Sequence, residues 1–215
     1  IATGLKYLIE NESFDYVITM DADGEDKPED IIKLIKASIK NSDKTIVAIR
    51  AKRNVSLLYL IMYSFHVCIT YIFTGKLIKF GNFVLLPNKH VSLITTDASL
   101  WNCFSSSIVK NLSPILKIKF DRGKRFFGKS NTNYLQLIYH SLTVISVFRK
   151  KVMLRIIIFS ILYTIFMHNS FTIFNSILLF VLLFFLIIIF LVSKRENLNG
   201  LLNSNANINS VEKIE

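Results

Sequence analysis

The sequence is poor in cysteine, and its metal-binding side chains of the Cys/His type are scattered. Its two cysteines, Cys68 and Cys103, form no CxxC motif and have no histidine pair nearby, and the four histidines show no metal-binding spacing. Cysteine and histidine in this pattern exclude a disulfide framework and a structural zinc site. We therefore expect both cysteines to be free, buried thiols in a reducing compartment.

Acidic residues are also few. The chain carries 15 aspartates and glutamates against 26 lysines and arginines, which gives a formal net charge of +11. A basic balance predicts an anionic partner such as nucleic acid, anionic lipid or a phosphorylated substrate. The Asn-rich end of the chain, residues 196–215, lacks a basic cluster. This argues against nucleic acid as a partner, and we expect this tail to be disordered.

Hydrophobic residues make up 52% of the chain and are concentrated in its last third. Two nearly uninterrupted apolar runs, residues 152–167 and 171–192, each have about the length that crosses a bilayer. The turn between them has no lysine or arginine, whereas basic residues precede the first run and follow the second. By the positive-inside rule, the sequence predicts a multi-pass protein of the cytoplasmic (inner) cell membrane. Its transmembrane hairpin would have both flanks, and the preceding domain, in the cytoplasm.

The region before residue 148 has the alternating pattern of an α/β domain. A helical segment at 2–10 precedes a short apolar strand at 16–20, and a helix opened by Pro28 precedes a second strand at 45–49. This order favours a mostly parallel, Rossmann-like sheet with ligands at the carboxyl ends of its strands. Further strands are expected at 81–87 and 115–120, and a further helix at 134–148.

Two helical segments have apolar faces whose environment can be predicted. The segment 56–75 is long enough to span a membrane, but His66 and several tyrosines favour an amphipathic helix at the interface. The helix after Pro28 is expected to bury one stripe against the sheet. That stripe comprises Ile31, Ile32, Ile35 and Ile39.

Four carboxylates follow the first strand within six residues, at Asp21, Asp23, Glu25 and Asp26. Carboxylates this close repel one another and need a counter-charge, for which a hard divalent cation is suited. Mg²⁺ or Mn²⁺ would bind one or two of them and complete its shell with the phosphates of a nucleotide. The alternative is a solvated acidic turn that caps the next helix. No twelve-residue loop ending in glutamate is present, so an EF-hand is excluded.

The stretch VITMDADGEDKPEDIIKLI, residues 17–35, resembles the signature of family 2 glycosyltransferases. The likeness is closest to the branch of dolichyl-phosphate mannose synthase and the polyprenyl-phosphate sugar transferases, in which the acidic turn follows a strand of the GT-A fold. The resemblance implies that Asp21, Asp23 and Glu25 hold Mg²⁺ or Mn²⁺. It also implies that Asp21 contacts the nucleotide and that Glu25 or Asp26 supports the pair.

Further segments match the family's motifs in the same order along the chain. Arg50 and Arg53 stand where the family places basic residues near the donor phosphates, and Gly81-Asn82-Phe83 matches a Gly-Asp/Asn-Phe motif. The segment RFFGKS, residues 125–130, resembles the R-x-x-G-x-S-K loop that closes over donor and acceptor phosphates. The resemblance implies catalytic roles for Asp23, Arg125 and Ser130, and substrate binding by Asp21, Arg50, Arg53, Asn82, Arg122 and Lys129.

The sequence departs from the family at three places. Asn82 stands where many relatives carry aspartate, and an amide cannot act as a general base. Either the acceptor is already ionic, as a polyprenyl phosphate is, or another group acts as the base. Asn131 replaces the usual lysine, whose role Lys129 would take. The chain begins at Ile1 inside a helix-like segment, before which the family's first strand and base-binding segment would lie. We therefore expect an N-terminally truncated, partial GT-A domain over residues 1–148, whose donor pocket is incomplete unless those residues exist upstream.

The sequence thus predicts a membrane-anchored, inverting hexosyltransferase of cell-envelope glycan synthesis. It would move a sugar from a nucleotide-sugar donor to a lipid-phosphate or glycan acceptor at the membrane, as a monomer or a homo-oligomer. Two alternatives stay open: a fragment of a processive polysaccharide synthase, whose QxxRW motif is absent, and a non-catalytic membrane scaffold derived from a transferase. The basic residues 122–129 could also bind anionic lipid headgroups.

Overall fold

The computed structural model describes residues 1–50, 57–121, 123, 125–126, 134–170 and 172–211. The chain divides into two compact units, which we call the sheet unit and the helical unit. The sheet unit comprises residues 1–55, 78–131 and 196–215, and the helical unit comprises residues 56–77 and 132–195. The chain therefore passes back and forth between the units, whereas the sequence suggested one domain up to residue 148 followed by a hairpin.

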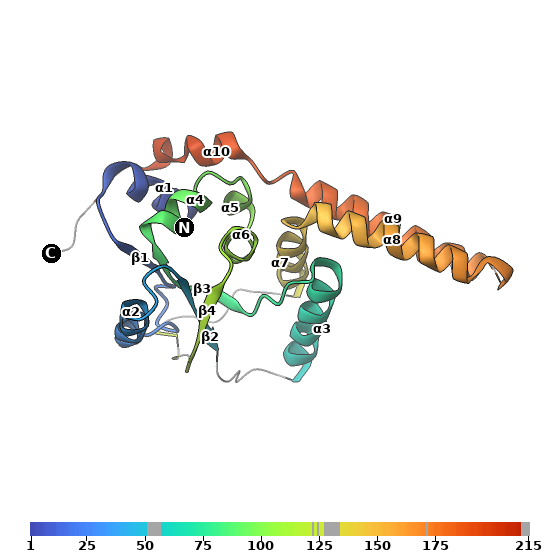
Figure 1. Cartoon of the computed structure of the whole chain (residues 1–215), viewed down its shortest axis with the longest axis horizontal. Coiled ribbons are helices and arrows are strands. Elements are labelled where there is room, and N and C mark those ends of the chain that lie inside the picture. Colours follow the sequence, from blue (N-terminus) through green and yellow to red (C-terminus); the bar gives the residue numbers. More distant parts are fainter. Residues whose placement is uncertain (51–56, 122, 124, 127–133, 171, 212–215) are drawn as a thin grey trace. The chain divides into compact units, whose positions relative to one another are not determined.

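The sheet unit contains a four-stranded mixed sheet in the order β1-β3-β2-β4 (Figure 1). Its strands are β1 (Tyr16–Thr19), β2 (Thr45–Arg50), β3 (Phe80–Pro87) and β4 (Ile115–Phe120). β3 runs antiparallel to both of its neighbours, and β2 and β4 are parallel. The expectation of a mostly parallel sheet is therefore wrong at β3. The reason is topological, because the chain leaves β2 and re-enters the sheet in β3 at the same edge.

This topology brings four strand ends to one edge of the sheet, which we call the site edge. The pairing of Thr19 with Val84, of Ile49 with Phe80, and of Arg50 with Phe120 places the carboxyl ends of β1, β2 and β4 beside the amino end of β3. The acidic turn follows β1, and the Gly-Asn-Phe motif lies at the start of β3. The fold therefore brings the acidic turn and the Gly-Asn-Phe motif to the same edge, although they are far apart in the sequence.

Side chains alternate between the two faces of the sheet along each strand, and helices cover both faces. On one face lies α2 (Ile31–Ile39), preceded by the 3₁₀ turn η1 (Pro28–Asp30). The cluster there consists of Leu34, Ile46, Phe83, Leu85 and Phe120. On the other face lie α4 (Asn88–Ile94), α5 (Ser99–Asn102) and α6 (Phe104–Asn111), as Figure 1 shows. Each large apolar side chain buried this way contributes about 1.5–3 kcal/mol.

The buried face of α2 differs from the predicted isoleucine stripe. Leu34 and Ser38 are buried, whereas Ile32, Ile35 and Ile39 are exposed by 57%, 47% and 76%. Positions 31, 34 and 38 are spaced at three and four residues, so they share a face as well as the predicted set does. Hydrophobicity alone selected the wrong one of two overlapping faces.

The carboxyl-terminal segment is ordered over residues 198–207, which corrects the expectation of a disordered tail. It forms α10 (Leu198–Leu202) and the 3₁₀ turn η3 (Ser204–Asn207), and both contact α1 (Ala2–Asn11). Asn197 caps α10 by accepting a hydrogen bond from the Gly200 amide at 2.8 Å. Leu201 is fully buried. One apolar anchor and a cap thus order a segment whose composition is mostly polar.

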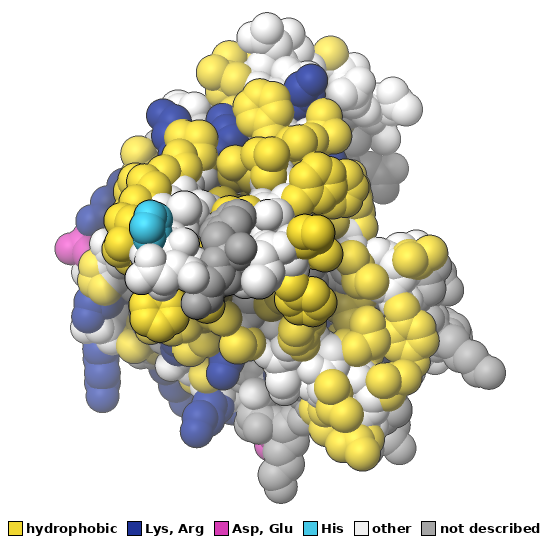
Figure 2. Space-filling view, turned by 90° about the vertical axis from the view of Figure 1, so that its right-hand side faces the viewer, with side chains coloured by type: hydrophobic (Ala, Val, Ile, Leu, Met, Phe, Trp, Pro, Cys, Tyr) yellow, Lys and Arg dark blue, Asp and Glu magenta, His cyan; other side chains and the backbone are white. Residues whose placement is uncertain are grey.

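The helical unit consists of α3 (Leu57–Thr74), α7 (Tyr134–Ser146), α8 (Arg149–Phe166), the 3₁₀ turn η2 (His168–Ser170) and α9 (Ile173–Ser193). α8 packs beside α9, and the Tyr163 hydroxyl donates to Asn175 Oδ1 at 2.9 Å. Many large apolar side chains of this unit are exposed, and hydrophobic side chains cover much of the face shown in Figure 2. Cys68 on α3 is exposed as well, which corrects the prediction of two buried thiols, while Cys103 is buried.

Two stretches of the described residues are long and apolar enough to cross a membrane, by length and composition alone. They are α3 and the stretch from Ile173 to Leu202 that contains α9. α8, the first member of the predicted hairpin, is not among them. Its first two turns carry four basic residues and leave an apolar run of only eleven, from Ile156 to Phe166, which is about 17 Å of helix.

Candidate functional site

The acidic turn after β1 is held in shape by its own carboxylates. Asp26 Oδ2 accepts a hydrogen bond from the Asp21 amide, and Asp23 Oδ1 accepts one from the Glu25 amide, both at 3.0 Å. Gly24 has a φ of +85°, a conformation that glycine adopts without steric cost. Asp26 therefore closes the turn rather than capping the following helix, where Lys27 occupies the cap position without a side-chain bond.

Asn82 joins the acidic turn to the start of β3. Its side-chain amide donates to Asp21 Oδ1 at 2.9 Å, and its carbonyl accepts from the Thr19 hydroxyl at 2.5 Å. β1 and β3 are paired up to Thr19, so the register of the sheet sets this contact. Asn82 thus orients the Asp21 carboxylate, which is a different task from activating an acceptor.

Arg125 supplies a counter-charge to the acidic turn from one hundred residues further along the chain. Its Nη2 lies 3.0 Å from Asp23 Oδ2, and its Nε lies 3.0 Å from Glu25 Oε1. The hydrogen bond to Glu25, together with the neighbouring carboxylates, raises the pKa of Arg125 above its ordinary value. The guanidinium side chain is one-third exposed, so water screens both ion pairs and weakens their contribution to stability.

The backbone around Arg125 docks onto the acidic turn as well. The Gly123 amide donates to the Glu25 carbonyl at 2.8 Å, and the Phe126 amide donates to the Asp23 carbonyl at 3.0 Å. We call this segment, residues 121–126, the docked loop; its residues 122 and 124 lie outside the described part of the chain. Four bonds, two ionic and two through the backbone, thus hold the docked loop to the turn.

Two glycines make this close approach sterically feasible. A Cβ at Gly123 would lie 2.7 Å from the Gly24 carbonyl oxygen, which belongs to the backbone and cannot rotate away. A Cβ at Gly24 would lie 2.5 Å from the ring of Phe126, which is itself 71% exposed. Composition and motif spacing gave no sign of Gly123 or Phe126 as site residues. Their importance appears only once the two segments are seen together.

The described carboxylates could bind a cation whose other ligands are substrate oxygens, but they do not form a complete metal site by themselves. Among the residues that the structure describes, no three His, Cys, Asp or Glu side chains are grouped to hold a metal ion. Mg²⁺ commonly binds only one or two protein carboxylates, which Asp21, Asp23 and Glu25 could supply. Arg125 contacts Asp23 Oδ2 and Glu25 Oε1, so a cation bound to these two oxygens would take the place of the guanidinium.

The remaining predicted site residues divide into two groups. Arg50 ends β2 at the site edge, in register with Phe120 of β4. The structure therefore gathers Asp21, Asp23, Glu25, Asn82, Arg50 and Arg125 around one edge. Arg53, Arg122, Lys129 and Ser130 lie outside the described residues.

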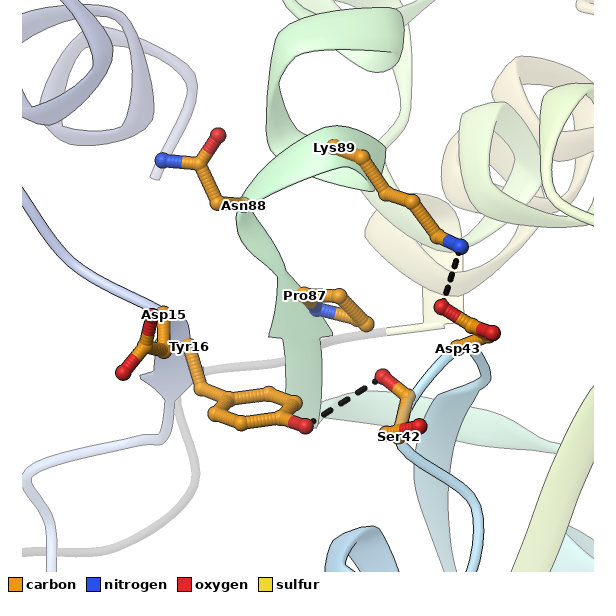
Figure 3. Close-up of a pocket in the computed structure, with 7 residues that line it drawn as sticks. All are labelled: Asp15, Tyr16, Ser42, Asp43, Pro87, Asn88 and Lys89. Carbon is orange, nitrogen blue, oxygen red and sulfur yellow. Dashed lines mark hydrogen bonds and ion pairs between the residues drawn. The ribbon is translucent and has the colours of Figure 1, made fainter.

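A shallow pocket at the opposite edge of the sheet has no counterpart among the predicted sites (Figure 3). It lies at the start of β1 and the end of β3, where the Tyr16 hydroxyl donates to the Ser42 carbonyl at 3.3 Å. Lys89 pairs with Asp43 at 2.5 Å and lowers the pKa of that exposed carboxyl. Both charged side chains are largely exposed, so the pair is screened by water. We assign this pocket no chemistry.

Comparison with known proteins adds no family to this description. The sequence matches no model of a protein family, and a search of curated proteins finds no significant match. The likeness to family 2 glycosyltransferases therefore stays a prediction from the sequence motifs.

Proposed function

We propose that this chain is a membrane-anchored, inverting glycosyltransferase of GT-A-like fold. The observation that carries the proposal is the convergence of three separate motifs at the site edge. Asn82 contacts Asp21, and Arg125 contacts Asp23 and Glu25. Ligands of open α/β sheets bind outside the carboxyl ends of the strands, and the carboxyl end of β1 is where the acidic turn lies.

The arrangement is suited to a leaving nucleoside diphosphate. Asp21 would face the nucleotide, and Asp23 and Glu25 would hold Mg²⁺ or Mn²⁺, which when bound supplies positive charge to the leaving group. Arg125, freed from the carboxylates, can present its guanidinium to a phosphate in two parallel hydrogen bonds. Arg50, from the adjacent strand end, adds a second cation. Phosphoryl oxygens would thus meet positive charge from two sides of the site edge.

The absence of a base at position 82 selects among acceptors. Asn82 is neutral and donates to Asp21, so it cannot take a proton from an acceptor hydroxyl. A lipid-linked phosphate is already an oxyanion near neutral pH and can attack the anomeric carbon without deprotonation. We therefore favour a polyprenyl phosphate over a glycan hydroxyl as the acceptor.

The membrane anchor in this proposal is α9, the longest apolar helix among the described residues. Lys194 and Arg195 follow it, and Arg149, Lys150 and Lys151 begin α8. The positive-inside rule places both groups on the cytoplasmic side of the cell membrane, where nucleotide-sugars are available. The sheet unit is joined directly to these flanks and would face the cytoplasm. α8, with its apolar run of eleven residues, would be the shorter arm of a hairpin with α9.

The decisive experiment is a transfer assay on membranes that contain the full chain. Membranes are incubated with a panel of radiolabelled nucleotide-sugars, with and without EDTA, and the lipids are then extracted and counted. We expect label in the lipid fraction for one donor, loss of that label with EDTA, and loss in Asp23→Asn. The matched control is Asp43→Asn, since Asp43 is an exposed aspartate at the opposite edge of the sheet. Transfer at the normal rate by Asp23→Asn would contradict the assignment.

One observation favours a second candidate, a non-catalytic membrane scaffold. Arg125 already neutralises two carboxylates of the turn, so the acidic turn has a counter-ion without any ligand. A scaffold predicts that calorimetry detects no binding of Mn²⁺ with any nucleotide-sugar, while the protein remains folded and in the membrane. Binding of a metal–nucleotide complex with a dissociation constant in the micromolar range would exclude the scaffold.

A further inference from the structure

α3 has one face that no described part of the chain covers, and that face is apolar. Its exposed positions recur every three or four residues, as one side of a helix does. They are Leu57, Leu58, Ile61, Ser64, Phe65, Cys68, Tyr71 and Ile72. Thr70 and Thr74 on the opposite side are buried, and α7 and α8 pack against α3 within the helical unit. We call the exposed positions the α3 stripe.

The carboxyl end of α3 is closed by groups from its own unit. Gly75, with a φ of +70°, donates its amide to the Tyr71 carbonyl at 2.8 Å. Arg155 of α8 donates to the Ile72 carbonyl at 2.5 Å and to the Tyr71 carbonyl at 3.3 Å. The Tyr71 and Ile72 carbonyls therefore have partners within the protein and do not require water. This reduces the number of backbone groups at the helix end that would be left unsatisfied at a membrane surface.

The covalent chain limits where the two ends of α3 can be. The helix is preceded by residues 51–56 and followed by residues 75–79, and these connectors begin and end at the same edge of the sheet, where Ile49 pairs with Phe80. Even fully extended, the steps from Arg50 to Leu57 and from Thr74 to Phe80 reach at most about 25 Å and 22 Å. The hydrocarbon core is about 30 Å thick. A spanning α3 would require one connector to cross it alone.

We propose that α3 lies in the plane of one membrane leaflet, with the α3 stripe against the acyl chains, and does not span the bilayer. Its occupant is lipid rather than protein, because the flanking charge is complementary to anionic headgroups. From Arg50 to Lys79 the chain contains five lysines and arginines and no acidic residue. Basic side chains beside an apolar helix face are typical of helices that lie on anionic membranes.

This geometry has a consequence for the candidate site, and the consequence rests on the proposed transferase function. The connectors of α3 begin at the carboxyl end of β2 and end at the amino end of β3, which are two of the strand ends that form the site edge. An in-plane α3 would therefore keep the site edge within a connector's length of the membrane surface. The site then takes an acceptor that is carried by the membrane, with its phosphate at headgroup level, rather than a soluble one.

The test is a nitroxide depth scan of the full chain in vesicles of phosphatidylcholine and phosphatidylglycerol, using oxygen and a water-soluble nickel chelate as relaxing agents. Cys68 provides a native labelling position, and single cysteines replace Leu57, Ile61, Phe65 and Ile72 in a Cys68→Ser background. In the plane of a leaflet, all five positions should share one depth, about 5–10 Å below the headgroups. In a spanning helix, Ile61 and Ile72 would differ by about 16 Å along the membrane normal.

α9 serves as the matched reference in the same protein. Exposed positions Ile173, Phe180 and Ile187 should give a depth that rises toward the bilayer centre and falls again. A profile of that shape along α3 would overturn the proposal, as would stripe positions that neither oxygen nor nickel reaches, because a second protein chain would then cover the stripe. The scan requires no sugar transfer. A failed transfer assay therefore leaves α3 as proposed, and a spanning α3 leaves the chemistry of the acidic turn untouched.

Discussion

The site edge and the helical unit differ in their side chains: the first pairs charged and polar groups, and the second exposes large apolar ones. At the site edge, the carboxylates of the acidic turn have an opposite charge or a hydrogen-bond donor at about 3 Å, as Asp23 and Glu25 have in Arg125. In the helical unit, large apolar side chains such as Phe166, Ile173 and Phe174 are more than 80% exposed. The first pattern suits water, and the second suits apolar surroundings. The exposed apolar helices are therefore where the proposed contact with a membrane would lie.

The same Leu→Ala substitution should separate the two regions most clearly. Leu85 is fully buried in the sheet, whereas Leu183 on α9 is more than half exposed. We expect Leu85→Ala to lower the free energy of unfolding of the sheet unit by about 2–5 kcal/mol, because it leaves a cavity. Leu183→Ala should leave that quantity unchanged. Pulse proteolysis in denaturant, on protein in membranes, measures both, and equal losses would erase the distinction between the regions.

A charge placed on an exposed apolar position tests which solvent surrounds it. Phe184→Lys on α9 should reduce membrane insertion by about 2.5–3.5 kcal/mol if the position faces lipid. Ile32→Lys on α2 replaces a residue of similar exposure in the sheet unit. We expect Ile32→Lys to change the free energy of membrane insertion by no more than about 0.5 kcal/mol. The readout is the fraction of protein that resists carbonate extraction. An inert Phe184→Lys would mean that water, not lipid, surrounds α9.

The docked loop can be detached without touching a charged side chain. Gly123→Ala places a Cβ against the Gly24 carbonyl, whereas a Cβ at Gly81 would have no atom within 4 Å. We expect Gly123→Ala to cost about 1–3 kcal/mol locally through steric strain and Gly81→Ala to cost much less. Hydrogen exchange at the Phe126 and Gly123 amides reports the loss. Unchanged protection in Gly123→Ala would show that the loop does not pack as described.

Removing the internal counter-ion should have the smallest effect on stability but a visible effect on cation binding. Arg125→Gln deletes two partly exposed ion pairs, which water screens. Because a cation no longer competes with the guanidinium, Mn²⁺ affinity should rise, by about tenfold at most. Lys89→Gln, which breaks the exposed pair with Asp43, is the control. Electron paramagnetic resonance of free Mn²⁺ measures both. If Arg125→Gln and the unchanged protein bind Mn²⁺ with equal affinity, the guanidinium and the cation occupy different positions.

The local structure of the sheet unit could be read from the sequence to a large degree. The four predicted strands correspond to β1, β2, β3 and β4, with ends that differ by a residue or so, because short apolar runs bounded by turns are local signals. The direction of β3 could not be read, because strand pairing depends on where the chain re-enters the sheet. The buried face of α2 was missed for a similar reason, since Leu34 and Ser38 share a face that the helical period permits equally.

The candidate site shows the same division. Asp21, Asp23, Asn82 and Arg125 could each be singled out from local motifs. Their contacts could not, because they depend on the register of β1 and β3 and on a loop that docks through two glycines. Arg125 was expected to meet phosphate, and in the structure it meets carboxylates instead. Opposite charges brought close together pair with one another when no ligand separates them.

Neighbours within a few residues decide which segments are strands, which helix is apolar enough for a membrane, and where negative charge accumulates, so the amino-acid order alone reveals these properties. The folded chain was needed to show that β3 is antiparallel, that residues 198–207 fold onto α1, and that Arg125 faces the acidic turn. Each of these depends on contacts between residues far apart in the chain. The free energy of each contact depends on both of the segments that form it, so neither segment predicts the contact alone.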